Sequence, residues 1–213
     1  MFRKAEILSR IELRQSTIKD WLSCPLMFRY RHVLQLAPSY RSLAAIHGSA
    51  LHLCIHRLHL EGFDLDLGLL YARALKEVLE SESHIPIRWK KGVEEDRLIM
   101  LTHAAEILKG YVNHEQNHTS TLMYSEVKFR LRVNGMLLTG TIDQVRRNLD
   151  SSLELIDLKS GMQRPMKHAL QRDWQLNLYA YALRYGEIFI HSSWVRIRMK
   201  VHRTSIYFLR AHE

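Results

Sequence analysis

The sequence is poor in cysteine, proline and glycine, and it lacks a long hydrophobic run. Its two cysteines, Cys24 and Cys54, are too few for a disulfide framework or a four-cysteine metal cluster. Four prolines and nine glycines leave few chain breaks. No apolar stretch approaches the about 20 residues that span a bilayer, and the charged N-terminus is unlike a secretory signal. These absences favour a reduced, intracellular (cytoplasmic) protein that has no membrane partner.

The charge balance is strongly basic. The chain carries 31 Lys and Arg against 22 Asp and Glu, a net charge of +9, and its pI is about 9.7. A surplus of this size favours a polyanionic partner such as nucleic acid, although a basic protein without one is the alternative. A length of 213 residues predicts a single domain over residues 1–213.

Helical periodicity dominates the first half. Apolar spacing predicts helices over residues 16–31, 48–60, 65–82 and 93–114, the first of them broken or kinked at Pro25. We therefore expect residues 1–120 to be mainly helical and residues 121–213 to form a sheet core that carries the active site.

The second half alternates as strands do. Residues 122–133 and 136–146 flank Asn134-Gly135, a strong signal for a tight hairpin. Further strands are predicted over 153–158, 193–200 and 205–209, with a helix over 166–185. Strands joined by tight turns pair antiparallel, and a strand reached through a helix pairs parallel. The expected fold is therefore mixed α/β, with a mixed β-sheet flanked by helices.

Chemistry is predicted around the segment ELIDLKSG. Asp157 and Lys159 lie two residues apart on a strand, so their side chains share a face. Asp143 on the preceding strand can approach Asp157, and two neighbouring carboxylates repel unless a cation lies between them. Oxygen ligands of this kind suit Mg2+ or Mn2+. Glu126 on the first strand is a further candidate ligand, and Lys159 can orient water or stabilise developing charge.

Two helices offer further candidates. Gln175 and Tyr179 are spaced i, i+4, so they share one helix face and can reach a common pocket. The alternative places Tyr179 in the core and Gln175 on the surface. His52 can complete a metal shell, although a histidine in this position is more often structural. His52 and His56 are spaced like a zinc pair, but residue 53 is Leu where a zinc protease has glutamate.

Taken together, these segments resemble the RecB-like nucleases of the PD-(D/E)XK superfamily, which include the RecB, AddB and CRISPR-associated exonuclease types. The resemblance covers most of the chain. Its motifs are STIKDWLSCPLMFRYRHV, HGSALHLCIH, SEVKF followed by GTIDQV, IDLKSG and QLNLYAYAL.

The resemblance implies a restriction-endonuclease-like core and a metal-dependent DNA exonuclease of recombination or repair, acting at DNA ends. It implies roles for eight matched positions. The implied metal ligands are His52, Asp143, Asp157 and the backbone carbonyl of Leu158, and the catalytic set adds Lys159, Glu126, Gln175 and Tyr179 to both aspartates.

The chain departs from many relatives in two ways. Cys24 matches the first of four iron–sulfur cysteines, but the C-terminal ones are missing, so no cluster is expected. The sequence contains no Walker A motif, so a separate helicase or recombination protein is a candidate partner. Arg164, Lys167 and Arg172 are candidate DNA contacts. The alternatives are an inactive nucleic-acid-binding adaptor that kept the fold and a histidine-rich zinc protein.

Overall fold

The computed structural model of the chain describes residues 13–81, 83–161 and 174–210. The chain divides into two compact units. Of the described residues, the first unit comprises 13–38, 122–155 and 174–205, and the second comprises 39–121, 156–161 and 206–210. The boundary between the units therefore does not follow the division of the sequence into a helical first half and a strand-rich second half. Part of the strand-rich half belongs to each unit.

The first unit begins with a broken helix. Helix α2 (Gln15–Ser23) ends just before Pro25, the first residue of α3 (Pro25–Phe28), which continues into the π-helical turn η1 (Arg29–Val33). Proline suits a first helical position because the N–H that it lacks has no partner there. The Cys24 sulfur accepts a hydrogen bond from the N–H of Met27 at 3.5 Å and so caps α3. The predicted break at Pro25 is confirmed.

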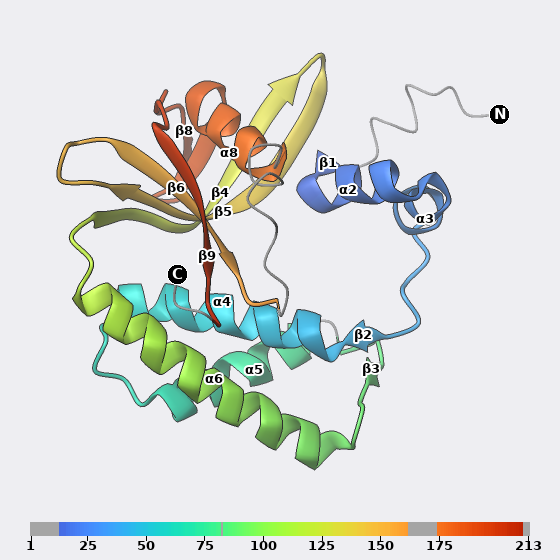
Figure 1. Cartoon of the computed structure of the whole chain (residues 1–213). Helices are drawn as coiled ribbons and strands as arrows, with labels where there is room; N and C mark the ends of the chain where they lie inside the picture. The colour runs from blue at the N-terminus through green and yellow to red at the C-terminus, as the bar shows by residue number, and fades with distance from the viewer. Residues whose placement is uncertain (1–12, 82, 162–173, 211–213) are drawn as a thin grey trace. The chain divides into compact units, whose positions relative to one another are not determined.

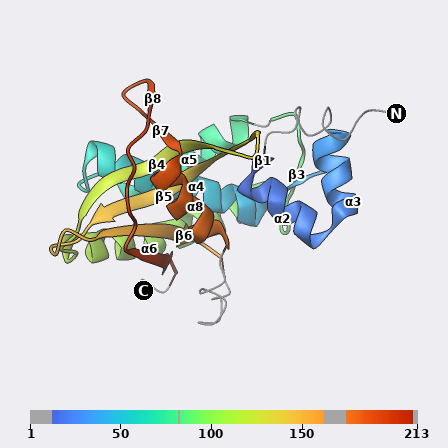
Figure 2. The same cartoon turned by 90° about the horizontal axis from the view of Figure 1, so that it is seen from above.

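Seven described strands form one sheet, and Figures 1 and 2 show β4, β5 and β6 running side by side. The order is β8-β7-β4-β5-β6-β9, and β1 pairs with β5. The strands are β1 (Leu13–Arg14), β4 (Thr121–Val133), β5 (Met136–Arg147), β6 (Leu153–Lys159), β7 (Glu187–Ile190), β8 (Ser193–Val195) and β9 (Arg203–Phe208).

Both strand directions occur in the sheet. The β4–β5 hairpin turns at Asn134 and Gly135, whose φ angles of 48° and 79° are those of the tight turn that Asn-Gly favours. β7 runs antiparallel to β4, and β1 runs parallel to β5. β9 follows β6 in parallel, since residue 202 bonds to residue 153 and residue 209 to residue 159. The predicted hairpin and mixed sheet are confirmed.

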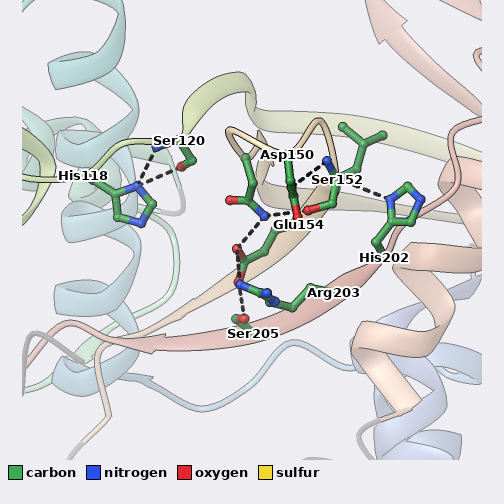
Figure 3. A network of polar contacts seen from close by, with 10 residues as sticks. His118, Ser120, Asp150, Ser152, Glu154, His202, Arg203 and Ser205 are labelled. Carbon is green, nitrogen blue, oxygen red and sulfur yellow. Dashed lines mark hydrogen bonds and ion pairs between the residues drawn. The ribbon is translucent and has the colours of Figure 1, made fainter.

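A polar network closes the turn between β5 and β6 (Figure 3). Glu154 is buried, accepts a hydrogen bond from the Ser205 hydroxyl and lies 3.9 Å from an Arg203 nitrogen. The N–H of Leu153 donates to His202 Nδ1 at 3.0 Å. These contacts join the beginning of β9 to the beginning of β6, which fixes where β6 starts.

The second unit is built on three helices, α4 (Leu43–Glu61), α5 (Leu67–Ser81) and α6 (Val93–Gln116), which Figure 1 shows in cyan to green. The short strand β2 (Arg41–Ser42), just before α4, pairs in parallel with β3 (Ile87–Arg88), which lies between α5 and α6. One apolar cluster holds the helices and the ends of β6 and β9 together. Its residues from β6 and β9 are Ile156, Leu158 and Tyr207, and Leu209 directly after β9 also belongs to it.

The structure corrects some boundaries. The helix predicted from residue 48 begins at Leu43, because the Ser42 hydroxyl caps it by accepting from the N–H of Ala45. The strand predicted over 193–200 was wrong beyond Val195, where irregular backbone follows, and β7 was missed. Helix α8 (Trp174–Tyr185) is the described part of the helix expected over 166–185. No described helix is long and apolar enough to cross a membrane.

Candidate functional site

Two carboxylates meet on neighbouring strands of the first unit. Glu126 on β4 and Asp143 on β5 have carboxylate oxygens within 4.8 Å of one another. Asp143 is buried at 8% exposure, and Glu126 is half-buried. Carboxylates at this distance repel unless protonated or bridged by a cation. The fold thus brings Glu126, which the sequence offered as a further candidate ligand, close to Asp143, while the predicted approach of Asp143 to Asp157 stays a prediction.

The backbone at Glu126 is unusual. Its φ of 50° lies in the left-handed region, which costs a non-glycine residue free energy. Strict alternation of buried and open side chains in β4 begins only after this residue, at Val127. The interruption therefore turns Glu126 out of the regular pleat. Such strain concentrates at functional positions.

Strand β5 is buried from Ile142 to Arg146, so it is covered on both faces around Asp143. The side chain of Arg146 is 2% exposed, and its Nε donates to Gln144 Oε1 at 3.0 Å. Burying these groups is tolerable because they are hydrogen-bonded. A rigid, water-poor strand thereby holds the Asp143 carboxylate.

In the second unit, Asp157 and Lys159 form an ion pair at the end of β6. Lys159 Nζ lies 2.7 Å from Asp157 Oδ2. The aspartate side chain is 2% exposed, whereas the lysine side chain is 38% exposed. Ile156 and Leu158, which alternate with them, belong to the apolar cluster. The predicted placement of Asp157 and Lys159 on one strand face is confirmed.

The residues that follow Lys159 are anchored. The Leu209 N–H donates to the Lys159 carbonyl at 3.0 Å, and Arg210 Nε donates to the Ser160 carbonyl at 3.0 Å. A Cβ placed on Gly48 of α4 would lie 2.9 Å from Ser160 Oγ. Glycine at position 48 therefore lets helix α4 approach the segment that carries the catalytic candidates. The sequence motif contained Gly48 but did not reveal this contact.

Gln175 and Tyr179 of α8 are hydrogen-bonded to one another. Gln175 Nε2 donates to the Tyr179 hydroxyl at 3.0 Å, and Gln15 Nε2 of α2 donates to Gln175 Oε1 at 2.8 Å. Tyr179 is buried, and its ring centroid lies 5.5 Å from that of Phe129. Tyr179 is thus both a core residue and a polar partner of Gln175. Sequence reasoning missed Gln15, which lies 160 residues from Gln175.

The remaining candidates are distributed as follows. His52 lies on α4 in the second unit, and Leu158 is buried on β6. His59 contacts the Tyr111 hydroxyl at 2.7 Å, and among described residues neither His59 nor His56 joins a group of three clustered metal-ligand atoms. This gives the zinc alternative no support. Arg164, Lys167 and Arg172 lie outside the described residues.

The thiols have structural settings. Cys24 is exposed at the cap of α3, and Cys54 is buried in α4. Burial raises the pKa of the Cys54 thiol to about 12, so it stays protonated and unreactive at neutral pH. The absence of an iron–sulfur cluster stays a prediction.

The donor chemistry fits a hard divalent cation. The Glu126–Asp143 pair offers oxygen ligands in a partly buried setting, where a cation relieves carboxylate repulsion. A cation held by such a pair suits metal-assisted hydrolysis of a phosphate ester. These features are typical of a metal-dependent hydrolase of phosphate esters.

A comparison with protein-family models gives the family. The model of the PD-(D/E)XK nuclease superfamily matches residues 12–204, and the chain belongs to this superfamily. Its mixed sheet and the six α-helices of its described residues agree with the restriction-endonuclease-like fold. A search of curated proteins finds no match. Membership supports nuclease activity and divalent-metal dependence.

Proposed function

We propose that this protein is a DNA nuclease of the RecB-like type that depends on Mg2+ or Mn2+ and releases nucleotides from DNA ends. The observation that carries the proposal is the pair of carboxylates, Glu126 and Asp143, on neighbouring strands of a chain that belongs to a nuclease superfamily. The basic charge of the chain agrees with a polyanionic substrate.

In this proposal Glu126, Asp143 and Asp157 supply carboxylate ligands, and His52 supplies a nitrogen ligand. The backbone carbonyl of Leu158 completes the set. When bound, the cation neutralises phosphate charge and lowers the pKa of a bound water. Oxygen-rich donors favour Mg2+ or Mn2+ over softer metals. The His52 and Leu158 assignments are supported by the resemblance of their segments to the family motifs.

Lys159 has the role of a catalytic cation. Its ammonium is held 2.7 Å from the Asp157 carboxylate, yet its side chain remains partly open to a substrate. From that position it can orient the attacking water and stabilise charge that develops on the phosphate. The ion pair with Asp157 restrains the Lys159 side chain, which reduces the conformational entropy that this side chain loses in the transition state.

Gln175 and Tyr179 have positioning roles. Gln175 uses one amide hydrogen on Tyr179 and its carbonyl on Gln15, which joins α8 to the start of α2. Arg164, Lys167 and Arg172 are proposed to contact the DNA backbone. Recombination or repair is the proposed context, with a separate helicase or recombination protein as partner.

Digestion of end-labelled single- and double-stranded DNA, with a circular control, tests the activity. In Mg2+ or Mn2+ the wild-type chain is expected to shorten linear DNA and to leave circles intact. Asp157→Ala is expected to lower cleavage by about 10³-fold, because a charge-stabilising element of the transition state is lost. DNA binding by the variant should be largely retained, since phosphate contacts dominate affinity.

Lys159→Ala serves as the second arm and should reduce cleavage by about 10²-fold while metal binding persists. A wild-type chain that binds DNA but cleaves none with either metal would contradict the proposal and favour the inactive adaptor. Cleavage of circular DNA would replace the exonuclease assignment with an endonuclease. Unchanged cleavage by Asp157→Ala would remove Asp157 from the site.

A further inference from the structure

A cavity of about 580 Å³ opens within the first unit. Its lining combines basic, hydroxyl and aromatic side chains from β1, α2, β4, β5, α8 and β8. Lys128 follows Glu126 by two residues on β4, and Thr141 precedes Asp143 by two residues on β5. Two residues of a strand span about 7 Å. The cavity therefore adjoins the two carboxylates of the proposed site along both strands.

The charge of the cavity is positive. Arg14 and Lys128 line it, and none of the described residues that line it is acidic. Both residues are exposed, and the Lys128 side chain makes no hydrogen bond or ion pair with another described residue. Two cations beside the hydroxyls of Thr139 and Thr141 suit an anionic group with several acceptor oxygens, such as a phosphate.

Trp194 provides an aromatic wall, and its ring is held in place by neighbours. The guanidinium of Arg130 lies 4.6 Å from the ring centroid, and the Phe189 ring centroid lies 5.2 Å from it. Arg130 is itself fixed by an ion pair with Glu187 at 2.5 Å. A restrained aromatic ring binds a flat ligand with little loss of side-chain entropy.

The floor of the cavity is equally rigid. A Cβ on Gly140 would lie 2.6 Å from the Phe129 ring, so only glycine allows that ring to cover β5. The Phe129 ring packs in turn against Tyr179, which is bonded to Gln175. The cavity is thus a preformed pocket, in the size range of small-ligand sites.

We propose that this cavity binds one nucleotide of a single DNA strand, with its base stacked on Trp194 and its phosphate held by Arg14 and Lys128. This inference rests on the proposed nuclease function and adds a substrate preference to it. A basic groove with an aromatic platform is the general solution for binding single strands without regard to sequence. The position next to Glu126 and Asp143 makes this nucleotide a neighbour of the bond to be cut.

The pocket selects single strands for a physical reason. A base in a duplex is already stacked and paired, and it reaches a side chain in a pocket only after it is extruded, at a cost in free energy. An unpaired base bears no pairing cost. The chain therefore prefers single-stranded DNA or the frayed single-stranded end of a duplex.

Fluorescence anisotropy of the full chain in EDTA tests the pocket without cleavage. The probes are a short single-stranded oligonucleotide, the same length with abasic sites, and a blunt hairpin duplex. The wild type should bind the single strand about 10-fold more tightly than the abasic strand, in proportion to the stacking of one base. Trp194→Ala should bring this ratio close to one, and Trp194→Phe should retain most of it.

Two further variants separate the contributions. Lys128→Ala should weaken binding to both strands equally and reduce the slope of log affinity against log salt by about one. Trp21→Ala is the matched control, because Trp21 is an exposed tryptophan of the same unit that does not line the cavity. It should leave the ratio of single-strand to abasic affinity unchanged.

An unchanged ratio in folded Trp194→Ala, or a wild type that prefers the duplex, would overturn the proposal. Binding is measured without metal, so a chain that cleaves no DNA can still prefer the single strand over the abasic strand. That result would contradict the nuclease proposal and support the pocket. A chain that cleaves DNA but shows no stacking ratio would remove the pocket alone.

Discussion

Both units bury apolar side chains, but they differ in the polar and charged side chains that they bury. The first unit buries polar and charged residues within its sheet: Asp143, Gln144, Arg146 and Glu154, together with Thr17 of α2. The second unit buries an apolar cluster from three helices, with Leu51, Leu58 and Leu108 fully inaccessible. Its buried polar residues are His47, Asp96 and Asp157.

We interpret the buried charges as serving chemistry and the apolar packing as serving stability. A buried charge costs free energy unless it is paired, so a sheet that keeps several of them gives up stability for another purpose. Hydrocarbon packed between helices stabilises the fold at about 25 cal/mol per Å² of buried apolar surface. The apolar cluster of the second unit packs against Ile156 and Leu158 and so holds the end of β6 in place. Asp157, which lies between them, is the buried charged residue of this strand end and pairs with Lys159.

The largest expected effect tests whether buried charge in the first unit serves catalysis. Asp143→Asn should lower DNA cleavage by about 10³-fold, because a ligand charge is lost, and should not destabilise the fold, because repulsion with Glu126 is relieved. Cleavage assays with Mg2+ or Mn2+ and urea unfolding measure the two effects.

Glu154→Gln is the matched control for that substitution, because Glu154 is a buried carboxylate of the same sheet. Its contacts are with Ser205, Asn148 and Arg203, so the variant should lose about 1–3 kcal/mol of stability and keep its cleavage rate. Equal losses of activity in both variants would contradict the expectation that Asp143 serves catalysis and Glu154 serves the fold.

The second effect tests the apolar unit. Leu108→Ala removes a fully buried side chain from α6 and should cost about 2–5 kcal/mol in the free energy of unfolding. Leu98→Ala on the same helix, at 62% exposure, should change it by less than about 0.5 kcal/mol. Chemical denaturation of both variants gives the comparison. Similar losses at the two sites would mean that the helices are not held by this cluster.

The smallest effect concerns His47, a polar residue within the apolar unit. Its Nδ1 lies 2.6 Å from the Tyr71 hydroxyl, and burial, with the charges of Arg210 and His103, lowers its pKa from 6.5 to about 4. Between these values the unfolded chain binds the proton and the folded chain does not. The stability contributed by neutral His47 is therefore complete above pH 6.5 and is lost as the pH falls toward 4.

Urea unfolding from pH 7 to pH 5 measures this effect. The free energy of unfolding of the wild type should fall by about 2 kcal/mol more than that of His47→Gln, which cannot take up the proton. Parallel pH profiles for the two proteins would show that His47 does not titrate differently in the folded and unfolded chains.

Local sequence patterns predicted many of the elements. The helices of the second unit have periodic apolar faces, and the Asn134-Gly135 turn determined the β4–β5 pairing. Short elements escaped prediction for a physical reason. β1 and β7 have two and four residues, too few for alternation to be distinguished from chance, and each pairs with a strand far along the chain.

The candidate site was predictable only in part. Spacing placed Asp157 and Lys159 on one face because the period of a strand is two. Motif order led to the superfamily that the family comparison confirms. The left-handed backbone of Glu126 and the hydrogen bond from Gln15 to Gln175 left no local signal, because each depends on surroundings that distant segments create.

The sequence by itself determined most of the longer elements, the hairpin register, and the shared face of Asp157 and Lys159, since these are set by neighbours within a few residues. The order of its motifs also determined membership in a nuclease superfamily. Only the tertiary structure decided that Glu126 meets Asp143, that Gly48 admits Ser160, and that Arg14, Lys128 and Trp194 line one cavity. These groups come from segments tens to hundreds of residues apart. Periodicity says which face a side chain takes but not which distant side chain it meets.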